Sequence, residues 1–108
     1  MKVSIQTAAH DDILRQYRYY LVEKDAARIA QQFLAAVQSA VETLSRTPEM
    51  GTPKHLENPL LAGLRSWPIP RFPSIRLYYI YAGNTLRIVR VLHGKRDIYP
   101  LLGEDDEV

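Results

Sequence analysis

Apolar and polar residues alternate along three short segments in the last third of the chain. The segments span residues 64–69, 75–81 and 86–92 and are rich in β-branched and aromatic side chains. An alternation of period two is typical of a strand with one face against a core, and Gly, Pro and Asn between the segments indicate turns. Gly83-Asn84 suits a two-residue hairpin with glycine in its first central position. The pattern therefore predicts an antiparallel meander.

A different period precedes the meander. Residues 3–7 alternate and predict a first short strand, whereas residues 8–23 and 26–46 repeat apolar side chains every three to four positions, which predicts two helices. Asp11 and Asp12 are expected to favour the positive end of the first helix dipole. So brief a break between the helices predicts an antiparallel hairpin, whose apolar stripe has only the sheet to bury against. The second helix carries the clearest stripe: Ile29, Ala30, Phe33, Leu34, Val37, Val41 and Leu44.

The boundaries of these elements follow from local chemistry. Thr7 and Asp25 are the expected N-caps of the two helices, and Pro48 ends the second helix. Residues 47–63 contain several prolines and glycines and are expected to form an irregular crossing loop, with residues 71–74 as a second, rigid connector. The predicted fold is α+β: an N-terminal strand and a helical hairpin packed on a small, mainly antiparallel sheet, in the order β-α-α-β-β-β.

The length and composition fit one small domain. The chain has 108 residues, and we expect residues 1–103 to form the domain and 104–108 a disordered acidic tail. There is no cysteine, so no disulfide or thiolate metal site is expected, which fits a reducing, cytoplasmic compartment. Three scattered histidines do not predict a metal site, and no cofactor is expected. No segment has the length and apolar character of a membrane span, and no signal-peptide-like leader is recognised.

The charge is unevenly distributed along the chain. The formal net charge is +2, but residues 104–107 hold four of the twelve acidic side chains. Without them, 14 basic side chains face 8 acidic ones. Most of the excess lies in the predicted sheet. A basic sheet followed by an acidic tail indicates an anionic partner, either a nucleic acid or an acidic protein segment, while a solvated basic face remains an equally open interpretation.

Five short motifs give the chain a resemblance to a known family. They are Ala-His-Asp-Asp-Ile at 9–13, Pro-Glu-Met-Gly at 48–51, Gly-Leu-Arg-Ser-Trp-Pro at 63–68, Tyr-Tyr-Ile-Tyr at 78–81 and Val-Leu-His-Gly-Lys-Arg-Asp-Ile at 91–98. In this order on so short a chain they resemble the ParE branch of the RelE/ParE toxin superfamily of bacterial toxin–antitoxin modules.

The resemblance implies a small cytoplasmic toxin that arrests growth and is neutralised by a cognate, ParD-like antitoxin encoded beside it, in a toxin–antitoxin hetero-oligomer. ParE-type members bind and poison DNA gyrase, whereas RelE-type members of the same fold are ribosome-dependent mRNA endonucleases. The fold does not separate the two, so the site must decide. A third alternative is a chain that has lost toxicity and survives as an antitoxin-binding module.

Each alternative predicts a different set of functional residues. A gyrase-binding toxin would not be an enzyme; its target-binding residues are expected to be Arg65, Arg96, Ile98, Tyr99, Leu101 and Leu102. The expected antitoxin-binding residues are Tyr17, Tyr20, Phe33, Val37, Trp67, Arg76 and Tyr79. A nuclease would hold phosphate and move protons with Arg65, Arg76, His93, Arg96 and Tyr99.

A purely structural interpretation also applies to the last motif. Gly94 permits a sharp exit from the last strand, and Asp97 can accept hydrogen bonds from nearby amides. Arg87 and Arg90 have opposite parity along their strand, so they share one face only if a bulge intervenes. A partly buried Arg65 would need an anionic partner, supplied by an antitoxin carboxylate or by the acidic tail.

Overall fold

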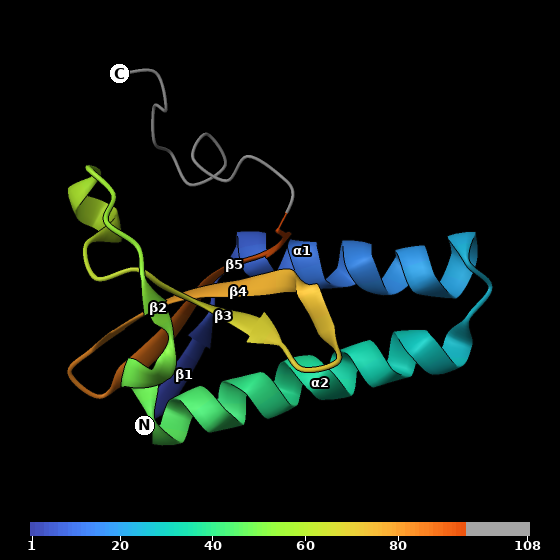
Figure 1. Ribbon diagram of the computed structural model, residues 1–108, viewed down its shortest axis with the longest axis horizontal. Helices are drawn as coiled ribbons and strands as arrows, with labels where there is room; N and C mark the ends of the chain where they lie inside the picture. Colours follow the sequence, from blue (N-terminus) through green and yellow to red (C-terminus); the bar gives the residue numbers. More distant parts are fainter. Residues whose placement is uncertain (95–108) are drawn as a thin grey trace.

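A five-stranded sheet with two helices on one side forms the body of the protein (Figure 1). The computed structural model of the chain describes residues 1–94. The acidic tail and the candidates Arg96, Asp97, Ile98, Tyr99, Leu101 and Leu102 lie outside the described residues. The sheet order is β1-β5-β4-β3-β2; β1 pairs with β5 in parallel and every other pair is antiparallel. The strands are β1 (Lys2–Ile5), β2 (Thr52–Pro53), β3 (Arg65–Ile69), β4 (Phe72–Ala82) and β5 (Thr85–His93). The α+β prediction is confirmed.

The helices differ from the sequence prediction at their ends. Helix α1 spans Thr7–Arg18 and continues as a π-helical turn, η1, over Tyr19–Glu23, while α2 spans Ala27–Arg46. Thr7 is the first residue of α1 rather than its N-cap. The second cap prediction is also wrong: Asp25 has φ 47°, and the N-cap position is taken by Ala26, with no side-chain hydrogen bond. Neither helix therefore begins at a residue whose side chain caps it.

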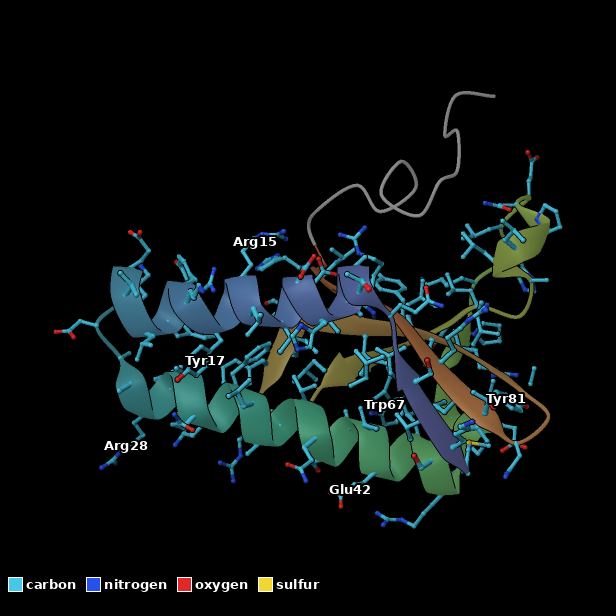
Figure 2. The ribbon with its side chains drawn as sticks, turned by 180° about the vertical axis from the view of Figure 1, so that it is seen from behind. Arg15, Tyr17, Arg28, Glu42, Trp67 and Tyr81 are labelled. Atoms are coloured by element: carbon cyan, nitrogen blue, oxygen red, sulfur yellow. The ribbon has the colours of Figure 1, made fainter. Side chains whose placement is uncertain are left out.

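The helix-facing side of the sheet holds the main core. From α2 it buries Phe33, Val37 and Leu44, which confirms the centre of the predicted stripe, whereas Ile29 remains 37% exposed at the end of the hairpin. Trp67, which packs against this core, lies between α2 and the strands (Figure 2). The sheet contributes Ile69, Ile75, Leu77, Tyr79, Leu86, Ile88 and Val91.

A second, smaller apolar cluster lies on the other face of the sheet. Tyr78, Ile80, Val89 and Leu92 are buried there against side chains of the segment between β2 and β3, namely Leu56, Leu61 and Leu64. That segment was expected to be irregular throughout, but it follows a 3₁₀ turn, η2 (Pro48–Met50), and β2, and it contains another 3₁₀ turn, η3 (Pro59–Leu61). Residues 56–64 therefore cover this face of the sheet with apolar side chains.

The β4–β5 pair carries a bulge that reverses the parity expected from the sequence. Arg90 lies opposite Tyr78, but Ile88 lies opposite the next residue of β4, Tyr79, so one residue of β5 is extra. As a result Arg87, opposite Ile80, and Arg90 occupy the same side of the strand by register. Alternation alone cannot reveal this because the bulge depends on the pairing of two distant strands.

The turns between the strands are tighter than the expected connectors. Strand β4 begins at Phe72, so the predicted connector at 71–74 is mostly strand, and the turn out of β3 needs a left-handed Arg71 with φ 72°. The predicted β4–β5 hairpin is confirmed: Ala82 pairs with Thr85, and Gly83 has φ 58°, a conformation that glycine adopts without strain.

Candidate partner-binding site

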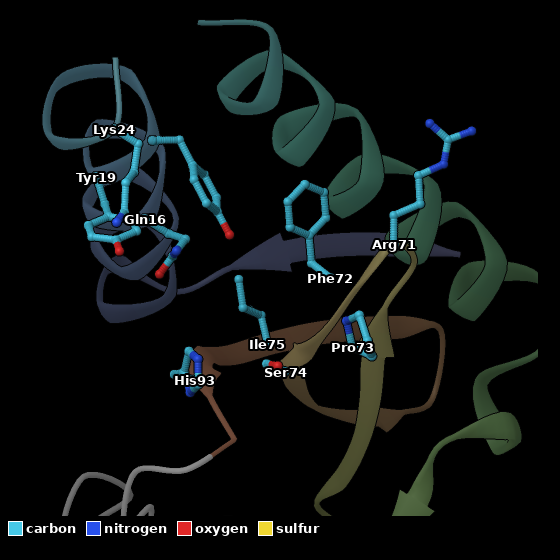
Figure 3. Close-up of a pocket in the computed structure, with 10 residues that line it drawn as sticks. Gln16, Tyr19, Lys24, Arg71, Phe72, Pro73, Ser74, Ile75 and His93 are labelled. Carbon is cyan, nitrogen blue, oxygen red and sulfur yellow. The ribbon is translucent and has the colours of Figure 1, made fainter. Parts of the chain in front are cut away.

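A hollow of ≈ 610 Å³ opens between the end of α1 and the turn that leads into β4 (Figure 3). Its walls come from three parts of the chain that are distant in sequence: the α1–η1 segment, the start of β4 and the end of β5. The lining residues are Gln16, Tyr19, Tyr20, Lys24, Arg71, Phe72, Pro73, Ser74, Ile75 and His93. The size is that of a pocket for one or two large side chains of a partner.

Aromatic rings form the inner wall of this hollow. Tyr20 packs on Phe33 and Phe72 with ring centroids 5.8 and 5.6 Å apart, and Phe33 and Phe72 meet edge to face at 5.5 Å. Tyr19 meets Tyr20 at 5.6 Å and is itself 42% exposed. Such pairs are stabilised beyond their buried area by about 0.5–1.5 kcal/mol each. The inner wall is therefore rigid and apolar, whereas Tyr19 presents its ring to solvent.

Two backbone irregularities lie at the same hollow. The π turn η1 contains Tyr19 and Tyr20, and it closes with the Lys24 N–H donating to the Tyr19 carbonyl at 3.1 Å. On the opposite wall Arg71 is held in the left-handed region at φ 72°, which is costly for a long side chain. Single π turns and strained non-glycine residues are enriched at functional sites. Their coincidence with an open hollow marks it as the leading candidate site among the described residues.

The charge around the hollow is cationic. Lys24 lies over the Tyr19 ring, 5.5 Å from its centroid, and Arg71 stands at the opposite rim with its guanidinium directed outward (Figure 3). None of the ten lining residues is acidic. An apolar wall with a cationic rim suits an apolar side chain flanked by carboxylates.

Arg65 is held at the other end of the sheet by its own chain. Its Nη1 donates to the carbonyl oxygens of Glu49 and Gly51 at 3.0 and 2.8 Å, and its guanidinium lies over the Tyr81 ring. These acceptors are neutral main-chain groups, not the carboxylate anticipated from the sequence. Arg65 therefore fastens the Pro-Glu-Met-Gly segment to the edge of the sheet.

Tyr79 fastens the same segment from inside the core. Its hydroxyl donates to the Pro48 carbonyl at 2.6 Å and accepts from the Gly51 N–H at 2.9 Å. A Cβ on Gly51 would overlap the Tyr79 hydroxyl, which explains the glycine of this motif. Burial raises the pKa of Tyr79 above its ordinary value, although the Gly51 hydrogen bond opposes the shift. The ring is fully buried, so this proposed antitoxin contact lies inside the core.

Three residues of the nuclease alternative, Arg65, Arg76 and His93, belong to the described part of the chain, whereas Arg96 and Tyr99 do not. Arg65 lies opposite Tyr79, near the start of β3, whereas His93 is the last residue of β5, opposite Ile75. Arg76 alternates with the helix-facing residues of β4 and donates to the buried Ser66 hydroxyl at 3.1 and 3.3 Å. By register Arg65 and His93 lie on opposite sides of β4 and four residues apart along it, whereas Arg76, opposite Leu92, is next to His93 in register but on the other face of the sheet.

The residues expected to bind an antitoxin divide into two groups. Phe33 and Val37, like Tyr79, are core residues that a partner could reach only by opening the fold. The half-buried members are Tyr17, Tyr20, Trp67 and Arg76. Of the whole set only Tyr20 lines the hollow; Tyr17 instead accepts from Gln31 Nε2 at 3.3 Å, which joins the two helices. No sequence pattern indicated Lys24 or Arg71 as site residues, because their position depends on the π turn and the β3–β4 turn.

Asp12 forms a buried clamp that the sequence interpretation missed. Strand β5 continues past the point where β1 ends at Ile5. On this part of β5 the Asp12 carboxylate accepts the Val91 N–H at 3.0 Å. Arg90 donates to the same carboxylate at 2.7 and 2.9 Å, and this hydrogen bond raises the pKa of Arg90 above its ordinary value. Arg15 lies 3.4 Å away. Asp12 therefore joins α1 to the edge of β5 rather than serving the helix dipole.

Within residues 1–94 no group of three or more metal-ligating side chains occurs. No helix in this part of the chain is long and apolar enough to cross a membrane.

Comparisons with known proteins identify the family. The sequence profile of the ParE toxin of the type II toxin–antitoxin system, parDE, matches residues 3–98. One similar solved structure, described as the chromosomal ParDE TA system from P. aeruginosa, has a TM-score of 0.65 and 18% identity over 86% of this chain and 95% of its own. Another, the YoeB/ParE toxin from Agrobacterium tumefaciens, has a TM-score of 0.57 and 20% identity over 86% and 98%. No curated protein sequence matches. The structural likeness supports the fold, and the profile covers most of the chain, so this protein belongs to the ParE toxin family of type II toxin–antitoxin systems.

Proposed function

We propose that this toxin acts by binding DNA gyrase in the cytoplasm and that a ParD-like antitoxin, encoded beside it, neutralises it. The observation that carries the choice of a binding toxin over a nuclease is the placement of Arg65, which lies opposite Tyr79 on one side of β4, whereas His93 lies opposite Ile75 on the other side. Cleavage of RNA needs a base, an acid and a phosphate-binding group around one scissile bond. Arg65 instead donates to two main-chain carbonyls of its own chain.

The hollow beside η1 is proposed as an antitoxin contact. An apolar side chain of the antitoxin inserts between Tyr19 and Phe72, and flanking carboxylates face Lys24 and Arg71. The support for this assignment is the exposed Tyr19 ring, the cationic rim and the lack of any acidic lining residue. An acidic antitoxin segment also agrees with the basic excess of the domain.

The target is tested by pulse-labelling after the toxin is induced without its antitoxin. Thymidine and methionine incorporation are followed in the same culture over the first minutes. An early fall in thymidine incorporation, followed by gyrase-dependent DNA cleavage with purified components, is the expected result. An earlier collapse of methionine incorporation would favour the ribosome-dependent nuclease and contradict the gyrase proposal. Unchanged incorporation of both would favour the non-toxic, antitoxin-binding alternative.

The antitoxin contact is tested by charge reversal. Lys24→Glu is expected to weaken binding of the neighbouring gene product roughly 3- to 10-fold, because a rim attraction becomes a repulsion. Arg28→Glu is the matched control, since Arg28 is an exposed basic residue of α2 outside the hollow (Figure 2). Equal binding by both variants, measured by titration calorimetry, would remove the hollow from the interface.

A further inference from the structure

The five strands of the sheet carry basic side chains but no acidic one. The basic residues are Lys2, Arg65, Arg76, Arg87 and Arg90. Arg65 already donates to main-chain carbonyls, and Arg90 already binds the Asp12 carboxylate. Arg76 and Arg87 form no ion pair with a carboxylate of residues 1–94. The described part of the sheet therefore carries positive charge without a counter-charge.

Arg76 and Arg87 lie on the same face of the sheet, the one away from the helices. By register Arg76 is opposite Leu92 and Arg87 is opposite Ile80, and both apolar partners belong to the cluster covered by residues 56–64. Directly opposite residues of paired strands share a face. Ile80 is four residues beyond Arg76 on β4, so the two arginines are about 14 Å apart along the sheet.

The guanidinium groups of both arginines have donors to spare. The Nε of Arg87 is buried without a hydrogen-bond partner among the described residues. Arg76 donates through Nε and Nη2 to one neutral acceptor, the buried Ser66 hydroxyl. The segment over this face contains one acid, Glu57, and neither arginine is paired with it. A guanidinium is always charged and has five N–H donors, so a partly buried one favours an anionic acceptor.

The chain's own acidic tail, residues 104–107, is tethered within reach of this face. The described part of the chain ends at Gly94, whose N–H donates to the Ser74 carbonyl; a Cβ placed on Gly94 would lie 3.9 Å from Cγ and Cδ of Arg76. Ten residues lead from Gly94 to Glu104 and can span up to about 33 Å, which exceeds the separation of the two arginines. Such a tether gives the tail an effective concentration in the millimolar range.

We propose that the acidic tail, Glu104-Asp105-Asp106-Glu107, docks on this face of the sheet and supplies the anion that Arg76 and Arg87 lack. Carboxylates accept paired hydrogen bonds from a guanidinium. An extended run of four residues spans about 10 Å, close to the separation of the two arginines, so one run can serve both. The tail is thus an internal cover, and an anionic partner reaches these arginines only by displacing it. The inference does not depend on which target or antitoxin the toxin binds.

The contact is tested on the whole chain by NMR of the arginine side chains. In a neutral-tail variant the four acids at 104–107 are replaced by their amides, which preserves their shape. The Nε–Hε resonances of Arg76 and Arg87 are expected to shift in this variant. The Arg65 resonance is the internal control and should stay in place, because Arg65 donates to carbonyls of its own chain. Unchanged Arg76 and Arg87 resonances would overturn the docking and favour the disordered tail expected from the sequence.

The covering role is tested with a short DNA duplex as a polyanionic probe. In the neutral-tail variant the slope of log Kd against log salt concentration is expected to steepen by about two, one for each freed arginine. Arg87→Gln should remove about one of these units in the neutral-tail variant and change little with the acidic tail in place. Arg28→Gln on the exposed side of α2 is the matched control and should act equally with either tail. Equal effects of Arg87→Gln with both tails would show that the tail does not cover Arg87 and would overturn the proposal.

Discussion

The Asp12 clamp gives the sharpest test of how this fold is held together. The Asp12 side chain is 2% exposed and that of Arg90 16%, and the carboxylate receives the Arg90 Nε at 2.7 Å as well as the Val91 N–H at 3.0 Å. Asp12→Ala removes the carboxylate that accepts from a largely buried guanidinium and from a buried main-chain N–H. Breaking such a buried pair costs about 3–5 kcal/mol. For a domain of this size the loss is a large part of the total stability, about 5–15 kcal/mol.

The assay is unfolding by heat and by urea, each followed by the fluorescence of Trp67, the single tryptophan. The melting temperature of Asp12→Ala is expected to fall by about 12–20 °C, taking about 4 °C per kcal/mol. Asp11→Ala is the matched control; Asp11 is exposed, so the change is expected to stay within about 0.5 kcal/mol. A double-mutant cycle with Arg90→Ala should show strong coupling. If Asp12→Ala costs no more than Asp11→Ala, the clamp does not stabilise the fold and the reasoning is refuted.

Two further predictions concern the Tyr79 hydroxyl and the loop that it holds. Burial raises the pKa of Tyr79 above 10.0, so folding favours the neutral phenol; its contribution to stability is complete below pH 10 and is lost as pH rises through the folded pKa. Tyr79→Phe should therefore lower the unfolding free energy by about 1–3 kcal/mol at neutral pH and flatten its decline at alkaline pH. If the unfolding free energy of both proteins declines equally with pH, ionisation of Tyr79 is not the cause of the decline. Gly51→Ala should cost about 1–3 kcal/mol because its Cβ meets the Tyr79 hydroxyl; if the cost is not smaller in the Tyr79→Phe background, the overlap is not its cause.

Local pattern was enough to predict the order of the main elements. Period-two segments became β3, β4 and β5, and the period of three to four residues became the α1–α2 hairpin. Both periods arise from the geometry of the chain itself and can be recognised without knowledge of distant contacts. The motifs were also informative, although the structure gives many of their residues architectural roles: Ala9 and Leu64 are fully buried, Asp12 clamps β5, and Gly51 makes room for Tyr79.

The candidate site was predicted far less well than the fold. Residue type and alternation singled out Phe33, Val37 and Tyr79 as antitoxin contacts, but apolar residues at regular spacing are the ones that a small core buries first. The hollow instead depends on Tyr19, Tyr20 and Phe72 meeting across two layers, and these rings belong to segments some fifty residues apart. No local sequence pattern indicates such a long-range contact.

The α+β class, the helical hairpin, the meander and the resemblance to ParE toxins could all be inferred from the sequence, since each rests on residues close together in the chain or on motifs in a fixed order. The β5 bulge, the acceptors of Arg65, the partner of Asp12 and the position of β1 at the edge of the sheet became apparent only in the folded protein. The first three join groups from distant segments, and the last depends on the order of the strands in the sheet. Their energies come from burial and hydrogen-bond geometry, which exist only once the layers have packed.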